Sequence, residues 1–358
     1  MRLPVLSTVS TICVFFVICA HSYFEYPTSL TTGIFSNWMI LDVNGVDFIV
    51  YQGVQFTIPF FLLTIGFYYG KALQRGANPF TFLILFGRKL LYIFFAWSLV
   101  YALIPPNFIS EFKQFGILSS IYVQLKTTYY WAINNKLELF LRGTKPHLWF
   151  MIACLTGLTI TSVFCKYRIE RFLIPFGMGL YLIGMLGVSY AETPIGLELE
   201  LPFLNNPKPQ PQPLFSTIFI AIGRWFSMHH EKNRRLALFL FFGGALMHFG
   251  EIFFLKRMYD INVLYHNFLL GTIIWGIGVF LLCLEYPNTG QNSILDRMGE
   301  LTLGIYVSHI LILYALMPID ALFKNLVWEI LKPVFALFLS YGLCQGLARS
   351  RILSKFLT

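Results

Sequence analysis

The sequence predicts an all-α membrane protein, a polytopic transmembrane helical bundle of about ten spans with both chain ends in the cytoplasm. Hydrophobic residues make up 57% of the 358 residues and charged residues only 12%, roughly half the charged share of a soluble globular protein. The apolar residues occur in runs of about twenty, the length that a helix needs to cross a hydrocarbon core of ~30 Å. Helices are expected because backbone polar groups must be paired internally in lipid.

Apolar runs follow one another along the whole chain, so we expect a single integral-membrane domain of residues 1–358. The first run also fits a signal peptide cleaved after Ala20, but Ile18 is poorly suited to the −3 position, and we expect the run to be retained. The predicted spans are residues 5–24, 50–70, 90–108, 147–165, 172–190, 212–228, 236–255, 262–284, 301–318 and 328–347.

Basic residues in the connections indicate the orientation, because Lys and Arg are enriched on the cytoplasmic side of a membrane. With a cytoplasmic N-terminus, most of the 26 Lys and Arg residues fall on that side. Two longer connections then face outward. Residues 109–146 contain an amphipathic aromatic stretch that predicts a helix on the membrane surface, and residues 191–213 end in a proline-rich crossing.

Ionisable side chains inside the predicted spans are costly in lipid and therefore point to function. His21 lies at the outer end of the first span, where it is either an interfacial or a reactive histidine. His248 and Glu251 share one face of the seventh span, as either a hydrogen-bonded link between helices or a proton pathway. Arg88 and Lys89 precede the third span, as either a topological anchor or a phosphate site. The six cysteines form no CxxC pair, and neither disulfides nor a metal site is expected.

Five ordered fragments resemble the membrane-bound acyltransferase type 3 family, which O-acylates sugars and related acceptors at bacterial envelopes. The family usually has an Asp-Gly-x-Arg element ahead of the first-span histidine, whereas residues 7–10 of this chain read STVS. The family also usually has two spaced arginines in the third span, and this chain has the single basic pair Arg88-Lys89 there. The fragments are RLPVLSTVSTICVFFVICAH (2–21), TIPFFLLTIGFYYG (57–70), Arg88-Lys89, HLWF (147–150) and LGIYVSHILI (303–312).

The resemblance, which extends over nearly the whole chain, implies a non-aminoacyl acyltransferase in the bacterial cytoplasmic (inner) membrane. It would move an acyl group, usually acetyl, from cytosolic acyl-CoA to a hydroxyl of an envelope glycan or lipid-linked glycan. Neither a metal nor nucleic acid would take part. Its partners would be membrane lipid and polysaccharide biosynthesis proteins. His21 would be the base. The donor would bind Arg88, Lys89 and Arg2, and the site would be lined by His147, Trp149, Tyr306, Glu251 and His248.

Two other functional classes remain open. A proton-coupled transporter or polysaccharide export component would use His248 and Glu251, although inverted repeats with paired broken spans, which favour a transporter, are not evident. A non-catalytic membrane partner is favoured by the missing arginines. Release of CoA from acetyl-CoA would separate the enzyme from both classes. The sequence specifies neither the acceptor nor the length of the acyl group.

Overall fold

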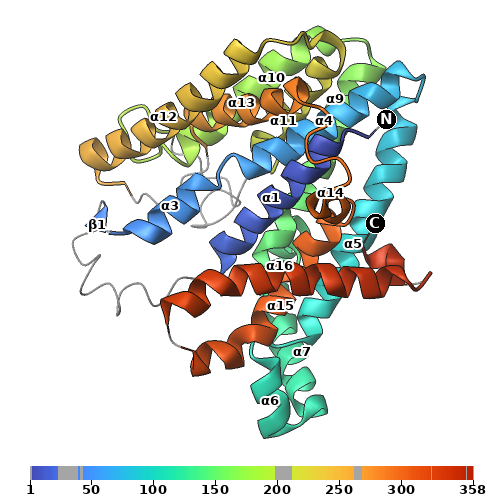
Figure 1. Cartoon of the computed structure of the whole chain (residues 1–358), viewed down its shortest axis with the longest axis vertical. Helices are drawn as coiled ribbons and strands as arrows, with labels where there is room; N and C mark the ends of the chain where they lie inside the picture. The colour runs from blue at the N-terminus through green and yellow to red at the C-terminus, as the bar shows by residue number, and fades with distance from the viewer. Residues whose placement is uncertain are drawn as a thin grey trace.

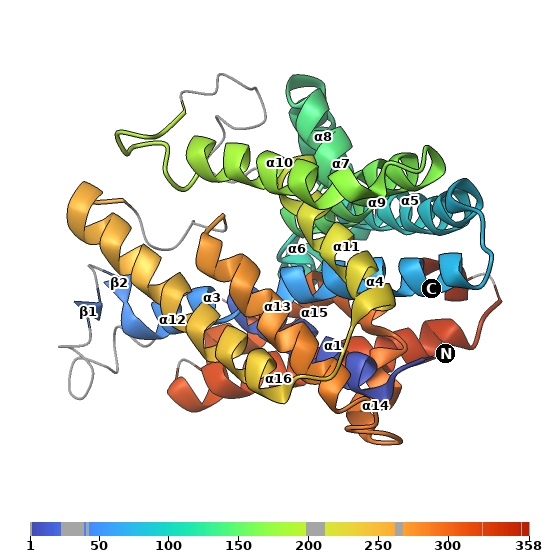
Figure 2. The same cartoon turned by 90° about the horizontal axis from the view of Figure 1, so that it is seen from above.

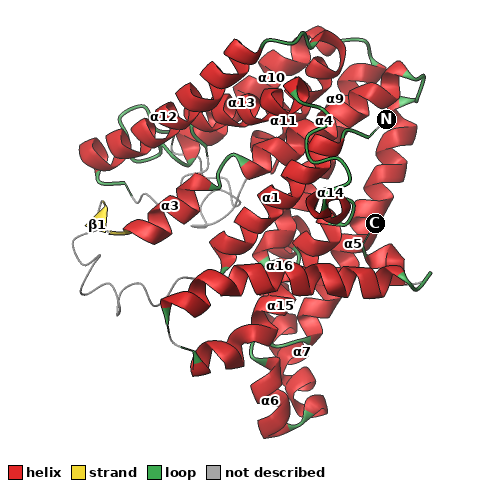
Figure 3. Cartoon of the chain, viewed as in Figure 1, coloured by secondary structure: helices red, strands yellow, loops and turns green. Residues whose placement is uncertain are grey.

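The computed structural model describes residues 2–22, 39–40, 43–197, 212–261, 268–323, 325–351 and 353–357, and these form a bundle of helices (Figures 1 and 3). The described non-helical elements include one short antiparallel pair, β1 (Met39–Ile40) with β2 (Val43–Asn44). The predicted all-helical fold class is therefore confirmed. Most of the predicted proline-rich crossing lies outside the described residues.

Each of the predicted apolar stretches contains a helix, and further short helices connect them. In chain order, with η marking 3-10 turns, they are α1 (Pro4–His21), α3 (Gly45–Gly53), α4 (Thr57–Gln74), α5 (Pro79–Leu103), α6 (Phe108–Phe115), α7 (Ile117–Asn134), α8 (Lys136–Arg142), η1 (Pro146–Leu148), α9 (Trp149–Lys166), η2 (Glu170–Phe172), α10 (Leu173–Gly187), α11 (Gln212–His229), α12 (Arg234–Tyr259), α13 (Leu270–Glu285), α14 (Ile294–Gly299), α15 (Thr302–Leu322), α16 (Leu326–Ala348) and η3 (Leu353–Phe356).

Within the described residues, seven helical segments are long and apolar enough to cross a membrane. The predicted spans at 172–190, 212–228 and 262–284 correspond to α10, α11 and α13, which are not among the seven. Helix α10 has 15 residues and α13 has 16, so each rises only about 22–24 Å. The first residues of the 262–284 span lie outside the described residues. The count of ten and the N-in, C-in orientation stay predictions. The seven segments are Pro4–His21, Phe48–Gln74, Pro79–Leu103, Pro146–Lys166, Arg234–Tyr259, Thr302–Leu322 and Val327–Ala348.

Helix α5, which corresponds to the third predicted span, begins earlier than predicted. This changes the position of Arg88 and Lys89 within it. Asn78 caps α5 by accepting hydrogen bonds from the backbone N–H groups of Phe80 and Thr81, and Pro79 occupies the first turn, a strong helix start signal. Arg88 and Lys89 therefore lie in the middle of the 25-residue helix. The prediction that they precede the third span was wrong, because the Asn-Pro start signal was overlooked.

The connection 109–146, predicted to face outward, forms three helices instead of one surface helix. The chain breaks at Gly116, whose φ is +81°, and again at Asn135, which ends α7. Helices α6 and α7 extend beyond the end of α5, at the bottom of Figure 1. Large apolar side chains along α7, including Leu118 and Tyr122, are exposed. The amphipathic, aromatic character predicted for this connection is thus present, although the break points were missed.

Close helix pairs in the bundle depend on glycine. A Cβ atom at Gly66 of α4 would lie 2.1 Å from the carbonyl oxygen of Ile220, and one at Gly223 of α11 would lie 2.0 Å from that of Leu63. Helices α12 and α13, side by side in Figures 1 and 2, make a similar contact at Gly244. Small residues let the two backbones approach, which is the usual means of helix association in a bilayer. These contacts join α4 to α11 and α12 to α13.

Candidate functional site

Helix α1 carries a polar residue at each of its ends. Arg2 lies just before the helix and His21 is its last residue. An α-helix rises 1.5 Å per residue, so the 18 residues of α1 separate these two side chains by about 27 Å. The helix therefore connects a basic end of the bundle with a histidine end, and the two ends are described in turn.

At the histidine end, His21 meets two other histidines from distant parts of the chain, and we call these three rings the imidazole cluster. The ring of His309 on α15 lies 5.3 Å from those of both His21 and His147, and the rings of His21 and His147 are 6.4 Å apart, measured between centroids. His309 and His147 are buried, with 0% and 3% exposed, whereas His21 is partly exposed. The structure thus places the predicted His21 and His147 together and adds His309.

Backbone carbonyls fix the proton positions on two of these rings. Nδ1 of His309 faces the carbonyl oxygen of Tyr306, and Nε2 of His147 faces that of Val307 at 3.4 Å. Because a carbonyl oxygen only accepts, each of these ring nitrogens is the N–H donor and the other nitrogen of each neutral ring carries a lone pair. Nε2 of His309 is buried and has no hydrogen-bond partner among the described residues.

Tyr101 of α5 holds α15 in place on either side of His309. Its hydroxyl donates to the carbonyl of Val307 at 2.7 Å and accepts from the N–H of Leu311 at 3.2 Å. These two backbone groups are the pair that an uninterrupted α-helix joins to each other. Tyr101 also packs its ring edge-on against His147, with 5.3 Å between centroids. The position of the His309 backbone is therefore fixed from α5 as well as from its own helix.

Aromatic side chains enclose the cluster. The Tyr306 hydroxyl donates to the backbone carbonyl of His147, and the Tyr306 ring lies 5.4 Å from that of Phe150. Trp149 lies one layer further out, against Phe150 and against Phe215 of α11. Tyr306 thus contacts the cluster directly, and Trp149 reaches it through Phe150.

A lysine at the end of the 109–146 connection lies next to the imidazole cluster in the sequence. Lys145 lies two residues before His147, and its Nζ sits 5.0 Å from the centroid of the Tyr314 ring. Burial lowers the pKa of Lys145 below its usual range, because removal from water disfavours the charged amine. Sequence reasoning missed Lys145, Tyr101 and His309. The rule that ionisable residues in a span are functional would have found His309, which lies in the quoted 303–312 fragment.

His248 and Glu251 lie in a separate part of the bundle. The two ring nitrogens of His248 contact Thr272 Oγ1 at 2.9 Å and Gln52 Oε1 at 3.2 Å, and the ring is fully buried. Glu251 accepts hydrogen bonds from the Tyr190 hydroxyl and from two backbone N–H groups at the start of α13, at 2.7–3.1 Å. A carboxylate is favoured at a helix N-terminus. Both side chains therefore join helices, and neither belongs to the imidazole cluster.

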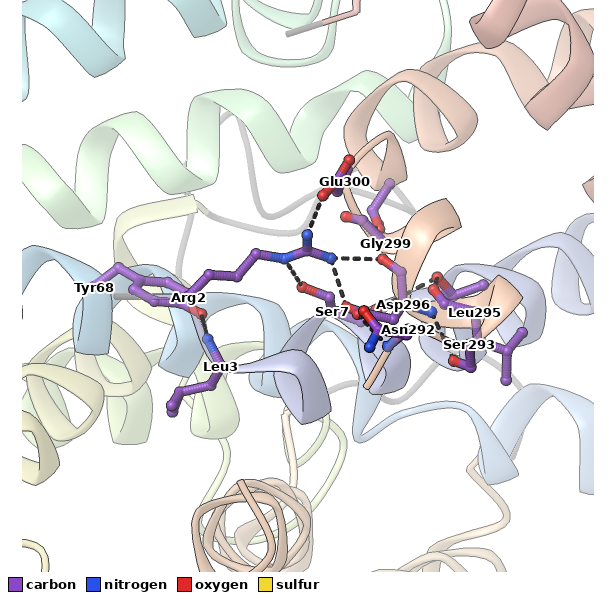
Figure 4. A network of polar contacts seen from close by, with 12 residues as sticks. Arg2, Leu3, Ser7, Tyr68, Asn292, Ser293, Leu295, Asp296, Gly299 and Glu300 are labelled. Carbon is purple, nitrogen blue, oxygen red and sulfur yellow. Dashed lines mark hydrogen bonds and ion pairs between the residues drawn. The ribbon is translucent and has the colours of Figure 1, made fainter. Parts of the chain in front are cut away.

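At the basic end, Arg2 fastens the start of α1 to α14 (Figure 4). Its Nη2 donates to Oδ1 of Asp296 at 2.5 Å and to the Asp296 carbonyl at 2.6 Å, its Nε donates to Ser7 Oγ at 2.8 Å, and its Nη1 pairs with Glu300. Asp296 also accepts from the N–H of Asn292 at 3.1 Å. The guanidinium that was predicted to hold a donor is thus engaged within the chain, and its role in donor binding stays a prediction.

A cavity of about 260 Å³ opens beside this end of α1, lined by Leu3, Phe67, Lys71, Gln74 and Arg75. Lys71 donates to the backbone carbonyl of Ser227 at 2.7 Å, which leaves it further N–H donors.

The predicted donor residues Arg88 and Lys89 do not line this cavity. Both are exposed on α5 and form no ion pair with another described residue. Their role in donor binding also stays a prediction. All six cysteines are free. In the described ranges, no group of three or more His, Cys, Asp or Glu side chains has an arrangement that could hold a metal ion.

Comparison with known proteins gives one match. The Acyl_transf_3 family model, described as an acyltransferase domain, matches residues 11–349. No curated protein and no solved structure matches the chain. The matched region contains all three residues of the imidazole cluster and begins directly after residues 7–10, the STVS segment.

Proposed function

Because the chain belongs to this acyltransferase family and is a multi-pass membrane protein, we propose that it transfers an acyl group, acetyl in the simplest case, from cytosolic acyl-CoA to a hydroxyl of an envelope or exported glycan. Its location would be a bacterial cytoplasmic membrane, beside the proteins that assemble the glycan. The observation that carries this proposal is the convergence of His21, His147 and His309 at one end of α1.

The imidazole cluster suits transfer from a thioester to a hydroxyl. The acceptor oxygen attacks the acyl carbon, its proton passes to a base, and the bond from carbon to sulfur breaks to release CoA. Neutral imidazole is an effective base for this step because its usual pKa lies near 6.5. Of the three rings, His21 is the one that is partly exposed. We therefore assign the contact with the acceptor hydroxyl to His21.

The donor phosphates are assigned to the opposite end of α1. Arg2 is already paired with two carboxylates, whereas Lys71 and Arg75 line the neighbouring cavity. Cationic side chains beside an open cavity suit the phosphates of a nucleotide-bearing donor. The acyl-pantetheine arm would then follow α1 toward His21. Arg88 and Lys89 are the alternative donor site, and separate substitutions of the two pairs distinguish them.

The contacts of His248 and Glu251 favour a structural role over a proton pathway. Both His248 ring nitrogens and both Glu251 oxygens contact described groups of neighbouring helices. A proton-coupled transporter would require these side chains to exchange protons with a water-filled route. Their connections within the bundle give such a route no support.

The test is CoA release by the purified protein in lipid nanodiscs, with labelled acetyl-CoA and glycan-bearing membrane extract as acceptor. We expect wild-type protein to release CoA and label the glycan, and His21→Ala to lower the rate about 100-fold or more. His229→Ala is the matched control, because His229 is exposed and stacks on Trp225 far from the cluster in sequence. Unchanged activity of His21→Ala would contradict the assignment of His21 as the base. Absence of CoA release from the wild-type protein would contradict the proposal that it is an acyl-CoA-dependent enzyme.

A further inference from the structure

The imidazole cluster contains one polar atom for which the transfer step above has no use. Nε2 of His309 is buried and unpaired among the described residues, in a side chain with 0% exposure. Buried polar atoms in folded proteins are nearly always hydrogen-bonded, so an unpaired one needs a functional or structural explanation. The ring of His309 lies 5.3 Å from the ring of His21, centroid to centroid.

The chemical state of this atom follows from its surroundings. Nδ1 of His309 donates to the Tyr306 carbonyl, so Nε2 carries the lone pair of the neutral ring. Tyr101 fixes the backbone on both sides of His309 through Val307 and Leu311. His309 is thus a buried hydrogen-bond acceptor whose tautomer and position are both set in advance.

His309 is better placed than His147 to act on His21. The centroid of the His309 ring is 5.3 Å from that of His21, against 6.4 Å for His147. Nε2 of His309 is also buried without a partner among the described residues. His309 is fully buried, so it would reach the acceptor through His21 and not directly.

We propose that His309 is a positioning residue that accepts a hydrogen bond from the N–H of His21 during acyl transfer. This inference rests on the proposed function. In the step, the acceptor O–H bond breaks and its oxygen forms the ester bond to the acyl carbon. The hydroxyl proton goes to the free nitrogen of His21, while the proton on the other His21 nitrogen stays hydrogen-bonded to Nε2 of His309. The bond from carbon to sulfur breaks, and His21 returns a proton to the sulfur as CoA leaves as a thiol.

This arrangement assigns to a neutral imidazole the task that a carboxylate performs in a Ser-His-Asp triad, which is to hold the reacting histidine in the correct tautomer and to stabilise its charged form. An ionised carboxylate would be far more costly to bury in an apolar bundle than a neutral ring. The choice of histidine at position 309 therefore agrees with the fully buried setting of its side chain.

The test measures kcat and KM for acetyl-CoA in nanodiscs with His309→Ala, and then adds free imidazole or pyrazole. Pyrazole has the same ring size but is a much weaker base. We expect kcat to fall about 100-fold with KM changed less than about threefold. Imidazole is expected to restore kcat at least about tenfold and pyrazole not to restore it. A ring that only filled space would be replaced equally well by both, and this outcome would overturn the proposal.

Two further variants keep the test decisive. His309→Gln places an amide oxygen, which accepts hydrogen bonds, near the Nε2 position, so this variant is expected to keep more activity than His309→Ala. If the alanine variant does not fold, the glutamine variant is measured in its place. His248→Ala is the matched control, a fully buried histidine outside the cluster, and should show no recovery with imidazole. If wild type releases CoA and His21→Ala does not, but both His309 variants keep full kcat, this inference fails while the proposed function stands. If wild type releases no CoA, the proposed function itself fails.

Discussion

The contacts of Arg2 predict that it is a structural clamp and not a ligand of the donor. Its side chain is 41% exposed, Glu300 is 59% exposed and Asp296 only 10%. An exposed pair such as Arg2 with Glu300 contributes about 0.5 kcal/mol. Removing one partner of a fully buried pair costs about 3–5 kcal/mol. Because Arg2 is partly solvated, we expect Arg2→Gln to lower the free energy of unfolding by about 2 kcal/mol, chiefly by leaving the Asp296 carboxylate underpaired.

The assay combines stability with donor affinity for Arg2→Gln, Asp296→Asn and the double variant. If the clamp is correct, denaturant titration in detergent gives a coupling energy of about 1–2 kcal/mol between the two positions, and KM for acetyl-CoA changes less than about twofold in all three. If Arg2 holds donor phosphates, Arg2→Gln raises KM about tenfold, while Asp296→Asn, which frees the guanidinium, does not raise it. Additive stability effects, or a tenfold rise in KM for Arg2→Gln alone, would refute the clamp.

Three other outcomes follow from the contacts. Lys71→Gln with Arg75→Gln should raise KM for acetyl-CoA about tenfold through loss of charge-assisted contacts, and a larger effect from Arg88→Gln would move the donor site to α5. Glu251→Gln should lower the free energy of unfolding by about 1–2 kcal/mol, because it weakens the cap of α13, and leave kcat unchanged; a large loss of kcat would revive the proton pathway. Tyr101→Phe should lower kcat about tenfold, with unchanged KM, by loosening α15 around His309; an unchanged kcat would show that the hydroxyl is dispensable.

Much of the bundle could be predicted because apolar length alone decides that a segment forms a helix in lipid. The helix starting at Pro79 shows the limit of this criterion, since apolar counting began the third span near residue 90 and overlooked the Asn78 cap. The second predicted span also divides, into α3 and α4, near Pro59. Proline removes a backbone donor and clashes with the carbonyl four residues earlier. Local capping and proline chemistry therefore set the boundaries that hydropathy does not resolve.

The site was only partly predictable for a different reason. The cost of an imidazole in lipid singled out His21 but left it either interfacial or reactive, and the family resemblance supplied its role as base, together with His147 and Tyr306. Tyr101 was missed because its partner Val307 lies 206 residues further along the chain, and no single-sequence pattern encodes such proximity, whereas His309 lies inside a predicted span and was overlooked. The same absence of tertiary information explains why His248 and Glu251 were grouped with the site, although the structure gives them other partners.

At the basic end of α1, the STVS segment of residues 7–10 packs closely against the region of α14. Ser7 and Thr8 of the STVS segment pack directly on the α14 region, because a Cβ at Gly299 would lie 2.3 Å from the Ser7 carbonyl oxygen and one at Gly290 would lie 2.3 Å from Thr8 Oγ1. A contact this close leaves no room for a ligand between α1 and α14. The cation that does reach this region is Arg2, and its charge is matched by Asp296 and Glu300. These contacts agree with the proposed placement of the donor on another face of α1, at the cavity lined by Lys71 and Arg75 beside Leu3.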